Sequence, residues 1–172
     1  TLPDIDARVT QMTNWLDLIT RHHAAAQADS GYEPIFGDAA SLERIDDAQA
    51  TIGVPIPTEL RDLYRSVDGY GLQMDPESML SPWFIVPTSE LADFVATHRS
   101  TIADTHNRLS KRFLPFIDWA NGDAMGYIYD RDGDLVDGLH IFSHELYRYE
   151  EDQDPGDFFR SFDGSLAEFL EP

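Results

Sequence analysis

Near the N-terminus, apolar residues recur at steps of three and four, at Ile5, Val9, Met12, Leu16 and Ile19. This spacing predicts an amphipathic helix, and Asp4 stands where a helix cap is expected. The alanine-rich stretch 24–28 can extend the helix. The following DSGYEPIFGDAAS is typical of a loop because Gly, Pro, Asp and Ser dominate it.

Two shorter helices are predicted next. The first begins after a Ser41 cap, turns Leu42, Ile45 and Ala48 inward and ends near Gly53, where VPIP prevents its continuation. The second begins at a Thr58 cap and presents one apolar face, formed by Leu60, Leu63, Tyr64 and Val67.

A longer helix is predicted from about Ser89, with Leu91, Phe94, Val95, His98 and Ile102 at helical spacing. A short helix is predicted at the C-terminus, where Ser165 and Glu168 have the spacing of a capping box before LAEFL.

Segments with the two-residue period of strands dominate the second half. Pro82 and Pro87 bracket the short apolar run WFIV, and later segments are FLPFIDW, MGYIYD, LHIFSH and LYRY. Helices followed by a run of strands predict an α+β fold, a single domain with a twisted, mostly antiparallel sheet flanked by helices.

Composition changes this picture through charge. The chain of 172 residues has 32 acidic and 12 basic residues and a net charge of −20. Such a chain repels nucleic acids and anionic membranes, and it attracts a basic protein or cations. Solubility, or a salt-rich habitat with an acidic proteome, is the alternative explanation of the charge. Its apolar runs are far shorter than the ~20 residues of a membrane span. Cysteine is absent, which fits a cytoplasmic location.

Half of this charge is concentrated in residues 118–157, which hold twelve acidic residues against Arg131 and Arg148. If the segments form adjoining hairpins, their loops bring a negative potential to one edge of the domain, which speeds encounter with a basic partner. A solvated rim that protects a sheet edge from aggregation remains the alternative.

A metal site at DRDGD is not supported. Counting an EF-hand loop from Asp130 places Leu135 where Gly is required and Ile141 where a bidentate Glu is required. Asp132-Gly133 instead predicts a hairpin turn. On a strand, His140 and His144 would lie ~13 Å apart, too far to share one ion. We expect no metal and no cofactor.

Catalytic motifs are also missing. The sequence has no GxSxG, no phosphate-binding P-loop and no GxGxxG. Carboxylate pairs carry little information in a chain with 32 acidic residues. We therefore expect a binding protein and not an enzyme.

Three segments resemble one known family. IGVPIPTELRDLYRSVDGYG resembles the signature of the SUKH superfamily (Smi/Knr-like proteins), and the likeness rests on Ile52-Gly53, Pro55, Pro57, Leu60, Leu63, Tyr64, Asp68-Gly69 and Gly71. FLPFIDWANGDAMGYIYD resembles the central strand–turn–strand unit of that family, and SFDGSLAEFL its terminal helix. The expected division is an N-terminal helical extension over 1–41 and a SUKH-like domain over 42–172.

The resemblance implies a function without catalysis or cofactor. Bacterial members of the superfamily are immunity proteins that neutralise a cognate polymorphic toxin, often a nuclease. Eukaryotic members are cell-wall assembly regulators, so an intracellular regulatory scaffold is the alternative. For an immunity protein, the expected partner is a basic toxin domain. The residues expected to bind it are Asp118, Trp119, Asp123, Tyr147, Tyr149, Glu150, Glu151, Asp152 and Asp154.

Overall fold

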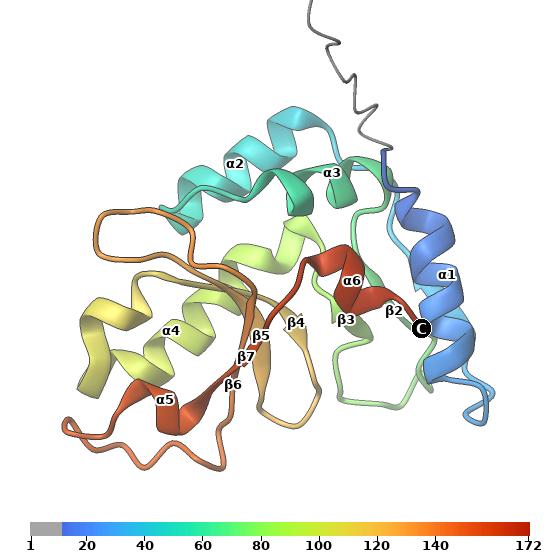
Figure 1. Ribbon diagram of the computed structural model, residues 1–172. Coiled ribbons are helices and arrows are strands. Elements are labelled where there is room, and N and C mark those ends of the chain that lie inside the picture. The colour runs from blue at the N-terminus through green and yellow to red at the C-terminus, as the bar shows by residue number, and fades with distance from the viewer. Residues whose placement is uncertain (1–11) are drawn as a thin grey trace, which may run out of the picture.

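A computed structural model describes residues 12–172 and confirms an α+β fold with an N-terminal helix (Figure 1). Six helices lie within these residues: α1 (Trp15–Ala26), α2 (Leu42–Ile52), α3 (Thr58–Ser66), α4 (Thr88–Ser110), α5 (Pro155–Phe158) and α6 (Leu166–Leu170). Seven strands lie among them: β1 (Pro34–Phe36), β2 (Tyr70–Leu72), β3 (Trp83–Ile85), β4 (Phe113–Asp118), β5 (Ala124–Ile128), β6 (Leu139–Phe142) and β7 (Phe159–Phe162).

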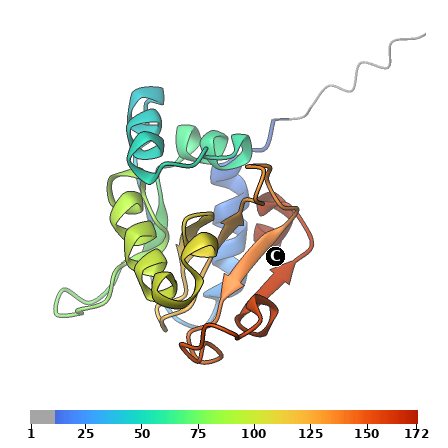
Figure 2. The ribbon, with the colours of Figure 1, turned by 90° about the vertical axis from the view of Figure 1, so that its left-hand side faces the viewer.

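The strands form one sheet in sequence order, β1 to β7, and every neighbouring pair is antiparallel. Helix α4 packs along β4 and α2, whereas α1 contacts α3 and α6. Figure 2 shows the twist of the sheet and α4 lying along it. Because each strand pairs with the next in sequence, the connections alternate between the two ends of the sheet.

Two carboxylates cap helices that lie far away in the sequence. Asp68 is buried and accepts hydrogen bonds from the Thr88 N–H (2.7 Å) and hydroxyl (2.6 Å) at the start of α4. Glu59 accepts from the N–H groups of Leu166 and Ala167, each at 3.0 Å, at the start of α6. Both satisfy N–H groups that a helix leaves unpaired, and each fixes one helix to the signature segment 52–71.

The helix ends follow the sequence closely with two corrections. Ser41 caps α2 by accepting from the Arg44 N–H, and Gly53 ends it at φ 79°. Leu42, expected to face inward, is 52% exposed because it occupies the first, outward-facing position of the helix. Thr58 is the first residue of α3 rather than its cap; Pro57 takes the cap position, and no side chain bonds there.

The first predicted helix falls partly on residues 4–11, which lie outside the described residues. Among the described residues, Met12 is not helical. Helix α1 begins at Trp15, and the Asn14 side chain caps it by accepting from the Asp17 N–H. Trp15, Leu18 and Ile19 lie in the main core, and β1 pairs with β2. These elements of the predicted extension thus share the core and the sheet of the rest of the chain.

The predicted strand LYRY is wrong. Residues 146–149 form an irregular loop in which Tyr147 turns into a second core cluster and Tyr149 adopts φ 58°. Alternating apolar residues therefore do not mark a strand here; Tyr147 packs against Phe142 and Phe158 instead. Strands β1, β2 and β7, each of three or four residues, were not predicted. Strand β1 lies within DSGYEPIFGDAAS, which was expected to be a loop.

Asp132 and Gly133 lie in a turn, as predicted, at the tip of the longer connection 129–138 between β5 and β6. Asp130 Oδ1 accepts from the N–H groups of Asp132 (2.8 Å) and Asp134 (2.9 Å), and Gly133 adopts φ 90°. These bonds lower the pKa of Asp130 because they favour its charged form. The Asp130 carboxylate of DRDGD thus stabilises the turn itself.

Candidate functional site: an acidic end and an apolar pocket

Four loops meet at one end of the sheet. The antiparallel order places residues 27–33, 73–82, 119–123 and 143–154 at that end, the lower edge of Figure 1. We call these four loops the acidic end. They hold ten acidic residues and one arginine, Arg148; the acidic residues are Asp29, Glu33, Asp75, Glu77, Asp123, Glu145, Glu150, Glu151, Asp152 and Asp154.

This arrangement corrects the expectation that residues 118–157 gather at one edge. Asp130, Asp132, Asp134 and Asp137 lie at the opposite end, because the β5–β6 connection turns there. Two loops that the sequence had not singled out, 27–33 and 73–82, replace them. The acidic end is therefore assembled from across the chain.

Loop 143–154 is shaped by the buried side chain of Gln153, which is 3% exposed. Its Nε2 donates to the Leu146 carbonyl (2.7 Å), and its Oε1 accepts from the Arg148 N–H (2.8 Å). Its own carbonyl lies 2.8 Å from His106 Nε2, at the point where α4 departs from helical geometry. One amide thus ties both sides of the loop together and joins the loop to α4.

The predicted acidic residues of this loop face solvent. Glu150, Glu151, Asp152 and Asp154 are exposed. Glu150 pairs with Arg148 (3.0 Å), and Asp154 caps α5 through the Gly156 N–H. Among residues 12–172, no ion pair involves Glu151 or Asp152. Their charges are therefore directed to solvent.

The three predicted aromatic anchors differ in exposure. Tyr147 is 4% exposed and belongs to the second core cluster, so its ring offers a partner no surface. Tyr149 is 66% exposed and rests on Tyr147 with ring centroids 4.5 Å apart. Trp119 is 39% exposed and lies in a different loop.

Asp123 joins loop 119–123 to loop 143–154. Its Oδ1 accepts from the His144 N–H at 2.9 Å and lies 2.7 Å from His144 Nδ1. Asp118, at the end of β4, accepts from the Ala120 N–H at 2.8 Å. The predicted residues thus fall into two adjacent groups, one with Trp119 and one with loop 143–154.

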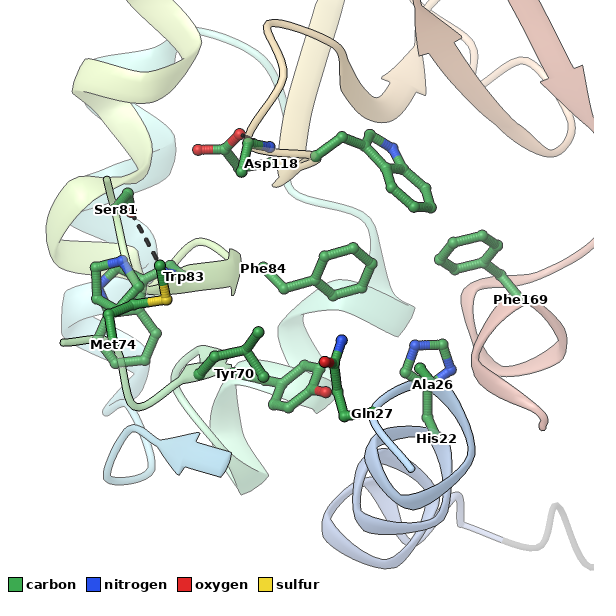
Figure 3. A pocket seen from close by; sticks show the side chains of 14 residues that line it. His22, Ala26, Gln27, Tyr70, Met74, Ser81, Trp83, Phe84, Asp118 and Phe169 are labelled. Carbon is green, nitrogen blue, oxygen red and sulfur yellow. Dashed lines mark hydrogen bonds between the residues drawn. The ribbon is translucent and has the colours of Figure 1, made fainter. Parts of the chain in front are cut away.

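Beside Trp119 lies an apolar pocket of about 530 Å³ (Figure 3). The lining residues come from α1, β2, β3, β4, α6 and three loops; they are His22, Ala26, Gln27, Tyr70, Leu72, Met74, Ser81, Pro82, Trp83, Phe84, Asp118, Trp119, Ala120 and Phe169. This volume is in the range of sites that bind small molecules.

Aromatic rings surround Phe84 at the centre of the pocket. Its ring meets Trp119 edge to face at 5.3 Å, Tyr70 at 5.9 Å and His22 in a stacked arrangement at 5.9 Å. Phe169 closes the far side, 6.2 Å from Trp119. Figure 3 shows Phe84, Phe169, His22 and Tyr70 converging on this space.

Burial in this wall alters the titration of two groups. It lowers the pKa of His22, whose Nδ1 lies 3.2 Å from the Leu170 carbonyl. It raises the pKa of Tyr70 to about 12. Both shifts favour the neutral form, so the pocket wall carries no cation of its own at neutral pH.

Sequence reasoning missed most of this pocket. His22, Tyr70, Phe84 and Phe169 come from four segments, and each is half-buried or buried. No local spacing unites them. The only local signal was Trp119 beside Asp118, two of the predicted partner-binding residues.

A metal site and a membrane-spanning helix are two further features to consider in residues 12–172. No group of three or more His, Asp or Glu side chains there is arranged to hold a metal ion. In the same part of the chain, no helix has the length and apolar character needed to cross a membrane.

A protein-family model matches most of the described chain. The model of the SMI1 / KNR4 family (SUKH-1) matches residues 39–170, about three quarters of the chain. No curated protein matches the chain. The matched region begins just before α2 and ends with α6, and it contains both helix-capping carboxylates.

Proposed function

Because the chain belongs to the SMI1 / KNR4 family (SUKH-1), we propose that it is a non-catalytic immunity protein. Its partner is a basic bacterial toxin domain, with a nuclease as the leading candidate. The protein neutralises the toxin by forming a stoichiometric complex in the cytoplasm of the cell it protects. The family supports the class of function, and the acidic end supports the kind of partner.

The observation that carries this proposal is the charge of the acidic end, ten acidic residues against one arginine in four loops. A nuclease binds phosphates through a basic surface. The carboxylates of the acidic end complement such a surface and cover it, so substrate is excluded by occupancy. Charges directed to solvent, such as Glu151 and Asp152, accelerate the encounter.

Coexpression tests the proposal. The toxin domain encoded beside this gene is produced in cells with and without the protein, and growth and complex formation are both measured. We expect growth to be rescued and a stable complex to be isolated. Absence of both rescue and complex contradicts the proposal, and several weak endogenous partners in place of one toxin favour the regulatory scaffold.

A charge-matched pair of variants makes the test specific. The four-acid variant carries Glu150→Gln, Glu151→Gln, Asp152→Asn and Asp154→Asn; Asn at 154 keeps the cap of α5. The control carries Asp62→Asn, Asp132→Asn, Asp134→Asn and Asp137→Asn, which removes the same charge outside the acidic end. We expect only the four-acid variant to weaken the complex.

A further inference from the structure

We propose that the apolar pocket is an arginine-binding site that receives one side chain of a basic protein partner. This inference deepens the proposed function and rests on it for the identity of the partner. Three properties of the pocket support this assignment: the chemistry of its walls, the charge of the segments that form it and the exposed loop beside it.

The walls are chiefly aromatic. Tyr70, Trp83, Phe84, Trp119 and Phe169 supply ring surface, and Trp119 is the most exposed of them. Such rings attract a cation that lies over their faces, and they also remove the apolar stem of a long side chain from water.

The segments that form the pocket carry mostly negative charge. Residues 22–33, 70–84, 118–123 and 166–171 contain eight acidic residues and no lysine or arginine. One of the eight, Glu171, forms an ion pair with Arg21 of α1 (2.8 Å). Among the acidic residues closest to the rings, Asp118 lines the pocket, and Glu90 on α4 accepts from the Trp83 indole at 3.1 Å. A cation with an apolar stem complements both the aromatic walls and the acidic residues around them.

Arginine fits this description better than lysine. Its planar guanidinium stacks on aromatic faces, is more weakly hydrated and can pair with carboxylates through several N–H groups. A lysine ammonium keeps its water more tightly and loses more on entering an apolar site. We therefore assign the pocket to the guanidinium group.

The adjacent loop indicates that this arginine belongs to a protein. Loop 73–82 supplies Met74 and Ser81 to the pocket wall, and between them it exposes Met79 (98%) and Leu80 (56%). Flexible apolar side chains beside a pocket provide contact area for a partner's surface. A free small cation would leave this apolar surface uncovered.

Peptide titration tests the pocket on the full chain alone. The three tryptophans give three indole N–H signals in ¹⁵N spectra: Trp83 and Trp119 line the pocket, and Trp15 is buried elsewhere as an internal control. The probes are four capped tripeptides, Gly-X-Gly, in which X is arginine, lysine, citrulline or norleucine. Citrulline keeps the shape of arginine without its charge, and norleucine keeps only an apolar stem.

We expect the arginine peptide to shift the signals of Trp83 and Trp119 to saturation and to leave Trp15 unmoved. Citrulline and norleucine should bind about tenfold more weakly, because they lose the cation–π attraction. Trp119→Ala should abolish the shift at Trp83. Tyr149→Ala, which removes another exposed aromatic of the acidic end, is the matched control and should leave the shift intact.

Three results overturn the inference. They are no saturable shift with the arginine peptide, equal binding of citrulline or norleucine, and equal shifts in loop 143–154, which would show adventitious attraction to charge. Because no toxin is used, these outcomes are independent of the coexpression test. A pocket that fails here leaves growth rescue possible, and failed rescue leaves the titration valid.

Discussion

Loop 143–154 of the acidic end and the apolar pocket beside it differ in what they present to solvent. Loop 143–154 presents carboxylates on a backbone held by one buried amide, that of Gln153. The pocket presents aromatic rings whose positions are set by β2, β3, α1 and α6. The loop thus offers long-range charge, whereas the pocket offers area that must be desolvated on binding.

This difference predicts that the loop and the pocket affect different rate constants of binding. Exposed charges act before contact and mainly change association rates, and they are screened by salt. Aromatic contacts become buried only once the two proteins have met, and they mainly change dissociation rates.

Loop 143–154 and the pocket each contain one of the two non-glycine residues with positive φ in residues 12–172, Tyr149 at 58° and Ala120 at 57°. Such strained backbone is concentrated at functional sites in proteins.

The largest loss of stability is expected in the central sheet, which supports both loop 143–154 and the pocket. A Cβ on Gly126 in β5 would lie 1.9 Å from the Leu114 carbonyl oxygen. Gly126→Ala should therefore lower the free energy of unfolding by about 3 kcal/mol or more and damage both together. Urea denaturation measures this loss. Gly133→Ala meets no atom within 4 Å and strains only a positive φ, so it should cost about 1 kcal/mol.

The next effect separates the pocket from the loop. Trp119→Ala should raise the dissociation rate of the toxin complex about 10- to 100-fold and leave association nearly unchanged. Surface plasmon resonance on the coexpressed pair measures both rates. Leu135→Ala, which removes an exposed apolar side chain at the opposite end of the sheet, serves as the control and should change dissociation less than about threefold. Equal effects of the two substitutions would remove the special role of the pocket.

A smaller effect tests how the loop is held. Gln153→Ala leaves the Leu146 carbonyl and the Arg148 N–H without their partner and should cost about 1–3 kcal/mol of stability. Hydrogen exchange should accelerate across 146–153 while the Trp119 indole signal keeps its position. Gln153→Glu is the isosteric comparison; it keeps the acceptor for Arg148 and loses the donor to Leu146. A shift of the Trp119 signal as large as that in the loop would contradict the separation.

The smallest effect concerns pH. Burial lowers the pKa of His22, His98 and His140 in the folded state, whereas histidine in the unfolded chain titrates near about 6.5. The unfolded chain therefore binds more protons below that pH, and stability falls as the pH decreases through about 6.5. Urea midpoints at pH 7.5 and 5.5 should show this loss. His22→Gln should reduce the difference, and an unchanged difference would exclude His22 as a contributor.

The sequence predicted the features that are local in the chain. The Ser41 and Ser165 caps, the Gly53 end and the family signature all depend on neighbours within a few residues. The carboxylate caps supplied by Asp68 and Glu59 bridge 20 and more than 100 residues, so no periodicity reveals them. The excess of charge was visible in the composition, but its division between the two ends depends on which way each connection turns. The pocket could not be predicted because its walls come from four segments that are distant in the sequence.

The most direct test measures association of the four-acid variant with the toxin domain by stopped flow, from 25 to 500 mM salt. At low salt we expect an association rate about three- to tenfold below that of the native chain, converging at high salt, with dissociation unchanged. The charge-matched control variant should associate faster than the four-acid variant at low salt. Identical association rates of the native chain and the four-acid variant at low salt would contradict electrostatic capture by the acidic end.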